Sequence, residues 1–249
     1  PPLSRGGGHA GDRDISRGRK DWREVEIMRS VRFILVITLF TVMNTLVSAQ
    51  APQKPAAKGD SKTGVLGHAA DGRYRNDLFG LELKYPADWH VVDQETTAAV
   101  LDIGTDFLKG DNQRSNNELE SSIKQEVVLF HLTRKPMGSI GNCVFMLAVQ
   151  KQPSPKVLPK MVAEATKSLL VNSPNLKVAR DTRTAMITGR QFAMIDFEMT
   201  VGEQKVIILY YVTVTKGYAL SYSLTFADTA DADRLALENI ARSITFDKK

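Results

Sequence analysis

The segment 191–226 reads QFAMIDFEMTVGEQKVIILYYVTVTKGYALSYSLTF and decides the fold class. In 192–199 and again in 218–226, successive side chains fall into two sets that alternate with period two, which is typical of strands. The stretch between them, 206–215, is apolar on both faces. Glycine-containing turns join the three strands at Gly202-Glu203 and Lys216-Gly217. Such turns favour antiparallel hairpins, and a strand that is apolar on both faces requires cover on both sides.

The residues after this meander predict a final helix. Asp228 is expected to cap it, and Asp231 and Asp233 lie in its first turn, where the helix dipole favours negative charge. Its inward stripe consists of Leu237, Ile240, Ala241 and Ile244. On the preceding strand, the face with Ala219, Ser221, Ser223 and Thr225 carries small side chains, which would let a helix approach closely.

Upstream, short alternating or apolar runs predict further strands. The run 80–85 alternates with period two and ends at Pro86. Further strands are expected at 89–92, 98–103, 126–132 and 143–150. The polar, Asn-rich stretch 106–120 is interpreted as a long loop with room for a short helix.

A helical period follows the last of these runs. Ser154 is the expected N-cap, with Pro155 at the first helical position. Leu158, Val162, Ala165 and Leu169 have helical spacing, and Asn172-Ser173-Pro174 ends the helix. The predicted fold class is therefore α+β, with an antiparallel sheet of about six strands sandwiched between helices.

The N-terminal part has the features of an export signal. Residues 28–49 read MRSVRFILVITLFTVMNTLVSA, in which two arginines precede an apolar stretch of eleven residues, 33–43. The small residues before Gln50 fit signal-peptide cleavage between Ala49 and Gln50. The apolar stretch is short for a membrane span, which needs about 20 residues. An uncleaved N-terminal anchor is the alternative interpretation.

The rest of the chain divides by composition. Residues 1–27 lack apolar periodicity and are interpreted as a non-native upstream extension, with Met28 as the true start. Residues 50–73 are rich in Pro, Ala, Gly and Lys, which predicts a flexible tether, and residues 74–249 form the folded domain.

Charge follows the same division. The whole chain carries a net charge of +5, but residues 74–249 hold 21 Lys/Arg and 21 Asp/Glu. The basic excess therefore belongs to the leader and the tether. The domain itself lacks the basic footprint of a nucleic-acid-binding protein, so we expect no nucleic-acid partner.

Two short patterns, at the start and at the end of the domain, resemble those of PsbP-like domains. The first is Gly80-Leu81-Glu82-Leu83-Lys84-Tyr85-Pro86 followed by Trp89, with Tyr74 before it. The second is Gly217-Tyr218 opening a strand to Phe226, an acidic helix start, and then Ser243-Ile244-Thr245-Phe246. The resemblance covers essentially all of 74–249. It implies an antiparallel sheet between helices and membership among exported bacterial proteins without known activity, and it transfers no metal ligands.

The candidates for chemistry are few. His90 and His131 form a conceivable metal pair if their strands are neighbours, although their spacing gives no support. Ser121-Ser122-Ile123-Lys124 matches Ser-x-x-Lys without the rest of that enzyme class's motifs. Gly138-Ser139-Ile140-Gly141 is similar to a nucleophile elbow but lacks the glycine two residues before the serine, so a turn is favoured.

Other notable side chains have simple structural interpretations. Cys143 lies in an apolar run and is expected to be a small buried hydrophobe. Asp228, Asp231 and Asp233 are expected to cap a helix rather than bind a cation. Trp89 is expected to close one end of the core, with a recognition surface of Tyr74, Tyr85 and Trp89 as the alternative.

These observations favour a non-catalytic, exported module that docks on another envelope or secreted protein, in the periplasm or outside the cell. We expect no cofactor, no catalytic residue and no stable membrane insertion after signal removal. Two other hypotheses stay open. One is an enzyme whose residues are scattered over several strands, and the other is a carrier of a small ligand or metal.

Overall fold

The computed structural model describes residues 66–247. These residues belong to one compact unit of the chain. The expected signal segment 28–49, the expected cut between Ala49 and Gln50, and residues 50–65 of the expected tether lie outside the described residues. No helix within 66–247 is long and apolar enough to cross a membrane.

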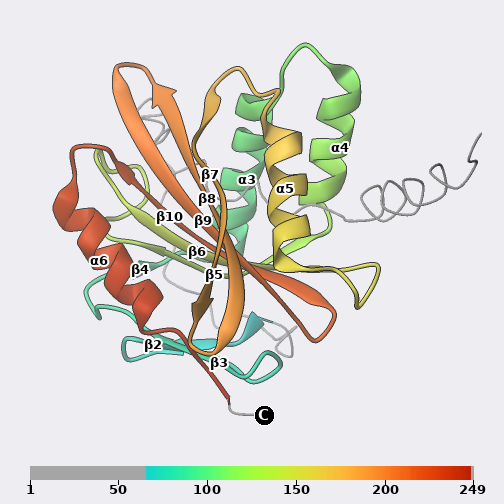
Figure 1. The fold of residues 1–249 in the computed structure, drawn as a ribbon. Helices are drawn as coiled ribbons and strands as arrows, with labels where there is room; N and C mark the ends of the chain where they lie inside the picture. Colours follow the sequence, from blue (N-terminus) through green and yellow to red (C-terminus); the bar gives the residue numbers. More distant parts are fainter. Residues whose placement is uncertain (1–65, 248–249) are drawn as a thin grey trace, which may run out of the picture. The chain divides into compact units, whose positions relative to one another are not determined.

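Within the described residues, seven antiparallel strands form the large sheet at the centre of the fold (Figure 1). In spatial order they are β4 (His90–Val91), β5 (Glu126–Thr133), β6 (Val144–Lys151), β10 (Tyr218–Ala227), β9 (Gln204–Thr215), β8 (Arg190–Val201) and β7 (Leu176–Ile187). The predicted meander is confirmed as β8, β9 and β10. At its second turn, Lys216 and Gly217 both have positive φ, which is the geometry of a type I′ hairpin.

A helical layer covers one face of this sheet. It consists of α3 (Gln94–Leu108), α4 (Gln113–Ile123) and α5 (Pro159–Leu170) (Figure 1). The other face carries α6 (Asp231–Arg242) and a small sheet of β1 (His68–Ala70), β2 (Arg73–Asn76), β3 (Leu81–Lys84) and β11 (Thr245–Phe246). The α+β class with antiparallel sheet and flanking helices is therefore confirmed.

The expected strand at 98–103 is wrong, because this segment lies inside α3. Asp93 caps the helix by accepting a hydrogen bond from the Thr96 backbone N–H at 2.7 Å. Thr97, Val100, Gly104 and Leu108 are buried at helical spacing. The apolar run 98–103 is short enough to fit a strand. The cap at Asp93 and the helical spacing of the buried residues on both sides of the run favour a helix.

The expected long loop at 106–120 is largely helical. It contains the end of α3 and most of α4, whose N-cap Asn112 accepts hydrogen bonds from the backbone of Arg114 and Ser115. Asn112 is the cap, the Asn116 side chain is hydrogen-bonded to Gly110, and Asn117 is exposed, so the local preference of asparagine for turns did not prevent a helix.

Two helix starts differ from the prediction. Helix α5 begins at Pro159, not at Pro155, and Leu158 is its N-cap. Helix α6 follows Ala230, so Asp228 does not cap it and instead lies 3.7 Å from Lys205. The acidic first turn of α6 is confirmed.

Two parts of the sheets were missed. Strand β7 was not predicted, because its side chains are mostly exposed and its pairing with β8 is interrupted by irregularities at Val178/Arg180 and Arg180/Arg183. Strand β1 lies in the stretch expected to be a tether, and it pairs with β2 through His68↔Arg75 and Ala70↔Arg73. The sheet therefore begins before Tyr74.

Candidate functional site

The two histidines named from the sequence lie on neighbouring strands but in different environments. His90 in β4 is exposed, whereas His131 in β5 is 2% exposed. The His131 Nδ1 atom is 3.0 Å from the Thr97 hydroxyl on α3, and Nε2 has no hydrogen-bond partner. Burial lowers the pKa of His131 to about 3, so its ring is neutral at pH 7. This geometry fixes α3 to the sheet.

The other candidates from the sequence are structural. Cys143 is fully buried, and burial raises the pKa of its thiol to about 12, which confirms the expected inert hydrophobe. Trp89 is buried in the core next to α6 and the small sheet, which confirms the core interpretation. Of the three aspartates at 228, 231 and 233, Asp233 in α6 forms an ion pair with Arg134. Across residues 66–247, no group of three His, Cys, Asp or Glu side chains is placed to hold a metal ion.

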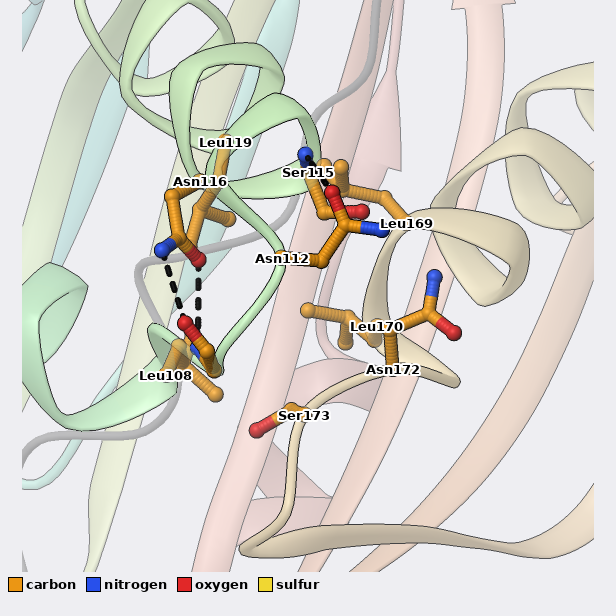
Figure 2. Close-up of a pocket in the computed structure, with 10 residues that line it drawn as sticks. Leu108, Asn112, Ser115, Asn116, Leu119, Leu169, Leu170, Asn172 and Ser173 are labelled. Carbon is orange, nitrogen blue, oxygen red and sulfur yellow. Dashed lines mark hydrogen bonds between the residues drawn. The ribbon is translucent and has the colours of Figure 1, made fainter.

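A small hollow lies where the α3–α4 connection, α4 and the end of α5 meet (Figure 2). Its volume of about 10 Å³ corresponds to a single water molecule. The lining combines leucines with neutral polar side chains. It consists of Leu108, Gly110, Asn112, Ser115, Asn116, Leu119, Leu169, Leu170, Asn172 and Ser173.

Two asparagines tie the walls of the hollow together. The Asn116 side chain donates to the Gly110 carbonyl at 2.8 Å and accepts from the Gly110 N–H at 3.1 Å (Figure 2). The Asn175 side chain donates to the Phe107 carbonyl at 2.9 Å, which links the segment after α5 to the end of α3. A Cβ at Gly110 would lie 3.2 Å from the Asn172 carbonyl oxygen, so glycine allows this close approach.

Some polar groups around the hollow keep their hydrogen-bonding capacity. Ser173 is buried, and its hydroxyl oxygen has no partner. Asn172 is exposed beside it. Because a buried hydroxyl without a partner costs free energy and the hollow has the volume of one water molecule, the hollow is suited to a bound water.

A larger apolar groove lies next to the hollow, and Leu170 lines both. The groove has a volume of about 250 Å³ and runs between the end of α5 and the edge strand β7. Its lining is Leu170, Val171, Leu176, Lys177, Val178 and Phe197. We name the hollow and the groove together the α5-end site.

The ion pairs near the α5-end site are structural. Lys167 of α5 lies 2.7 Å from Asp181 of β7 and 2.7 Å from Glu164, and both carboxylates raise its pKa. Asp196 of β8 is held by Arg183 at 2.8 Å and by Arg180 at 3.5 Å. These pairs fix β7 in place, and Lys177 is the one charged residue among those that line the α5-end site.

Sequence reasoning did not find this site. It marked Asn172-Ser173-Pro174 as a helix stop and 106–120 as a loop, and it predicted no strand at β7. The available signal was the concentration of Asn and Ser in two segments far apart in the chain. Only the tertiary packing of α4 against α5 brings these segments together.

Comparison with known proteins gives matches of structure alone. No family model matches the chain, and no curated protein matches it. Cyanobacterial PsbP (CyanoP) from Synechocystis sp. PCC 6803 has a TM-score of 0.43 and 16% identity, covering 75% of this chain and 100% of its own. LpqN, involved in cell envelope biogenesis of Mycobacterium tuberculosis, has a TM-score of 0.41 and 12% identity, covering 68% and 83%. A PsbP is thus among the structures to which this chain is similar, and the fold class itself rests on the sheets and helices described above.

Proposed function

We propose that this chain is an exported, non-catalytic module that binds another protein of the cell envelope or of the secreted fraction. The observation that carries the proposal is the α5-end site. It places an apolar groove beside neutral hydrogen-bonding groups, and such a combination is typical of binding sites. Its lining contains Lys177 as its one titratable side chain.

Acid–base catalysis requires titratable groups within hydrogen-bond reach of a substrate, with pKa values near the working pH. The buried histidine and the cysteine of the described residues, His131 and Cys143, lie away from the α5-end site. His131 is sealed under α3 with a pKa of about 3, and the Cys143 thiol is raised to about 12 by burial. Neither lines the α5-end site. The site is therefore better suited to binding than to proton transfer.

The export part of the proposal rests on residues 28–49, with cleavage between Ala49 and Gln50. Its features are the arginines before the apolar stretch and the small residues before the cut. A protein with such a signal is exported, so the proposed location of the mature protein is the periplasm or the medium of a bacterial cell.

Native mass spectrometry of the protein purified from the envelope or medium of its own host tests the proposal. We expect a chain that starts at Gln50, together with the added mass of a bound protein. A chain that keeps residues 28–49 contradicts export with cleavage and supports a membrane anchor. A chain that starts at Gln50 with the added mass of a metal ion or small molecule supports a carrier instead.

A further inference from the structure

We propose that the free edge of β7 pairs with the same edge of a second copy of this chain, antiparallel and centred on Ala185. The inference goes beyond the proposed function and does not depend on it. It follows from the position of β7 in the sheet, the regularity of residues 183–187, and the groups that such a pairing brings together.

Among residues 66–247, β7 is the longest strand at a sheet edge. The edges of the two sheets are β1, β11, β4 and β7, of which the first three have two or three residues each, whereas β7 has 12. Since β7 ends the large sheet, no strand of the described residues pairs with its outer side. A long free edge presents unpaired main-chain N–H and C=O groups and is a template for another strand.

The two halves of β7 differ in their protection against such pairing. The first half contains Lys177, Arg180 and Asp181, and both interruptions of the β7–β8 ladder lie between positions 178 and 183. Charged side chains and bulges protect sheet edges. In 183–187 the ladder is regular, and the one charged residue, Arg183, donates a hydrogen bond to Asp196 of its own chain. The second half is therefore the open one.

The turn after β7 fixes which main-chain groups point outward. Residues 188–189 both have positive φ and form a two-residue hairpin turn, so the flanking residues Ile187 and Arg190 are a hydrogen-bonded pair. Hydrogen-bonded and non-hydrogen-bonded pairs alternate along an antiparallel ladder. Thr184 and Met186 are consequently in non-hydrogen-bonded pairs with β8, and their N–H and C=O groups point to the free edge.

These outward groups are self-complementary. When two β7 edges run antiparallel about Ala185, Thr184 of each copy faces Met186 of the other. Each of these two pairs exchanges two main-chain hydrogen bonds, so the pairing makes four. Ala185 lies opposite its counterpart on the two-fold axis, in a non-hydrogen-bonded pair with Cα atoms about 4.5 Å apart. The smallest side chain of the segment therefore lies where the two copies approach most closely.

The side chains favour the same register. Met186 is 68% exposed, and contact with Thr184 of the second copy would remove its apolar surface from water. Arg183 would lie opposite Ile187 of the second copy, so no like charges face each other. Registers centred on position 184 or 186 pair fewer residues of the regular segment, because Ala185 is its midpoint. Open main-chain groups accept any extended strand, and this symmetry about Ala185 favours a second copy.

A cysteine scan tests the pairing and its register. The native chain has one cysteine, Cys143, which is buried. Ala185→Cys should form a disulfide-linked dimer with oxidised glutathione, because a Cα separation of about 4.5 Å lies within the disulfide range of about 4.4–6.8 Å. Thr184→Cys and Met186→Cys are the matched controls. Each should form at least about tenfold less dimer, because identical residues are then diagonal neighbours about 7–8 Å apart.

Sedimentation equilibrium of the purified protein measures the dimer without a covalent bond. We expect a reversible dimer with a dissociation constant of about 10–500 μM, since a single edge-to-edge contact lies at the small end of protein interfaces. Thr184→Pro should weaken the dimer at least about tenfold, because proline removes an outward N–H donor from each copy. Thr184→Val keeps this donor and should leave the dimer unchanged.

A second variant guards against loss of folding in the first. Met186→Lys places a charge on the edge at an exposed position, and it should also weaken the dimer at least about tenfold. Circular dichroism and the melting temperature establish that each variant is folded.

Three results overturn the inference. The first is a monomer at all concentrations up to about 1 mM. The second is preferential disulfide formation at position 184 or 186, which indicates another register. The third is a dimer that Thr184→Pro and Met186→Lys both leave intact, which places the contact elsewhere. The proposed function is tested separately, because a bound partner adds a mass other than that of a second copy in native mass spectrometry.

Discussion

The two faces of the large sheet are both buried, yet they are built from different side chains. The face under α6 and the small sheet is aromatic. Tyr74 stacks on Phe130 at 4.6 Å between ring centroids, and Tyr222 lies 4.7 Å from Tyr211 and 5.9 Å from Phe145. The face under α3 is polar along β5 and β10, where the buried residues include His131, Thr133, Ser221, Ser223 and Thr225.

The two faces are therefore stabilised in different ways, one by burial of apolar area and the other in part by hydrogen bonds between buried side chains. The aromatic face is held by burial of apolar area, and the stabilising free energy is roughly proportional to that area. Where α3 covers β5 and β6, the apolar cluster is small and consists of Val128, Val144, Met146 and Ala148, with Leu101 packed against it. Toward α5 the same face has a large apolar cluster, to which α3 contributes Val100 and Leu108. The contact of α3 with β5 therefore depends more on individual hydrogen bonds such as Thr97–His131, and we expect this contact to open before the aromatic face.

The largest effect is expected from Phe145→Ala on the aromatic face. Phe145 is fully buried, so the loss of its ring should reduce the free energy of unfolding by about 3–5 kcal/mol. Urea denaturation measures the change. Ile140→Ala is the exposed control and should change stability by less than about 0.5 kcal/mol. If Phe145→Ala reduces the free energy of unfolding by less than His131→Gln does at pH 7, the proposed contrast between the faces is wrong.

The next effect concerns His131 on the polar face and appears as a pH dependence. The pKa of His131 is about 3 when folded and 6.5 in its ordinary state, so the unfolded chain binds the extra proton as pH falls below 6.5. Stability is therefore complete above pH 6.5 and is lost progressively toward pH 3. Between pH 7 and pH 5 the loss from this group should be about 2 kcal/mol.

His131→Gln removes the titrating ring and keeps a side chain that can hydrogen-bond to Thr97. The difference in unfolding free energy between the native protein and this variant should shift by about 2 kcal/mol in favour of the variant from pH 7 to pH 5. Denaturant titrations at the two pH values measure it. Parallel pH curves for the two proteins contradict a buried, neutral His131.

A smaller effect is expected at the N-terminus of α4, which forms part of the α5-end site. Asn112→Ala removes the cap of the Arg114 and Ser115 backbone N–H groups and should cost about 1 kcal/mol. Hydrogen exchange of the α4 amides should become faster, while β10 amides stay unchanged. Gln113→Ala at the next, exposed position is the control. Equal acceleration across the whole domain argues against local opening on the helical side.

The smallest effect is expected from Lys167→Met, which removes the ion pairs of α5 with Asp181 and Glu164. Exposed pairs contribute little, and salt screens them. The loss of stability should be smaller than each of the preceding effects and should disappear at an ionic strength of about 1 M. A loss that persists at high salt indicates that the hydrogen bond from the Lys167 ammonium to Asp181, not its screened charge, joins α5 to β7.

Several elements followed directly from local patterns. The meander β8–β10 was predictable because alternating side chains and glycine-containing turns specify hairpins without reference to the rest of the chain. The burial of Cys143 was predictable from its apolar neighbours in the chain, and that of Trp89 from its large aromatic side chain. The segment 98–103 was not, because a short apolar run fits both a strand and a helix until its cap and partner are known.

The sequence by itself determined the meander of β8, β9 and β10 with its hairpin turns, and the positions of β3, β5 and β6. These features depend on neighbours in the chain and on side-chain period. The tertiary structure alone decided that Asn112, Asn116 and Ser173 line one hollow, that β7 closes the sheet beside a groove, and that His131 is neutral under α3. Each of these depends on contacts between residues far apart in the chain, and burial, which sets both pKa and exposure, exists only after those contacts form.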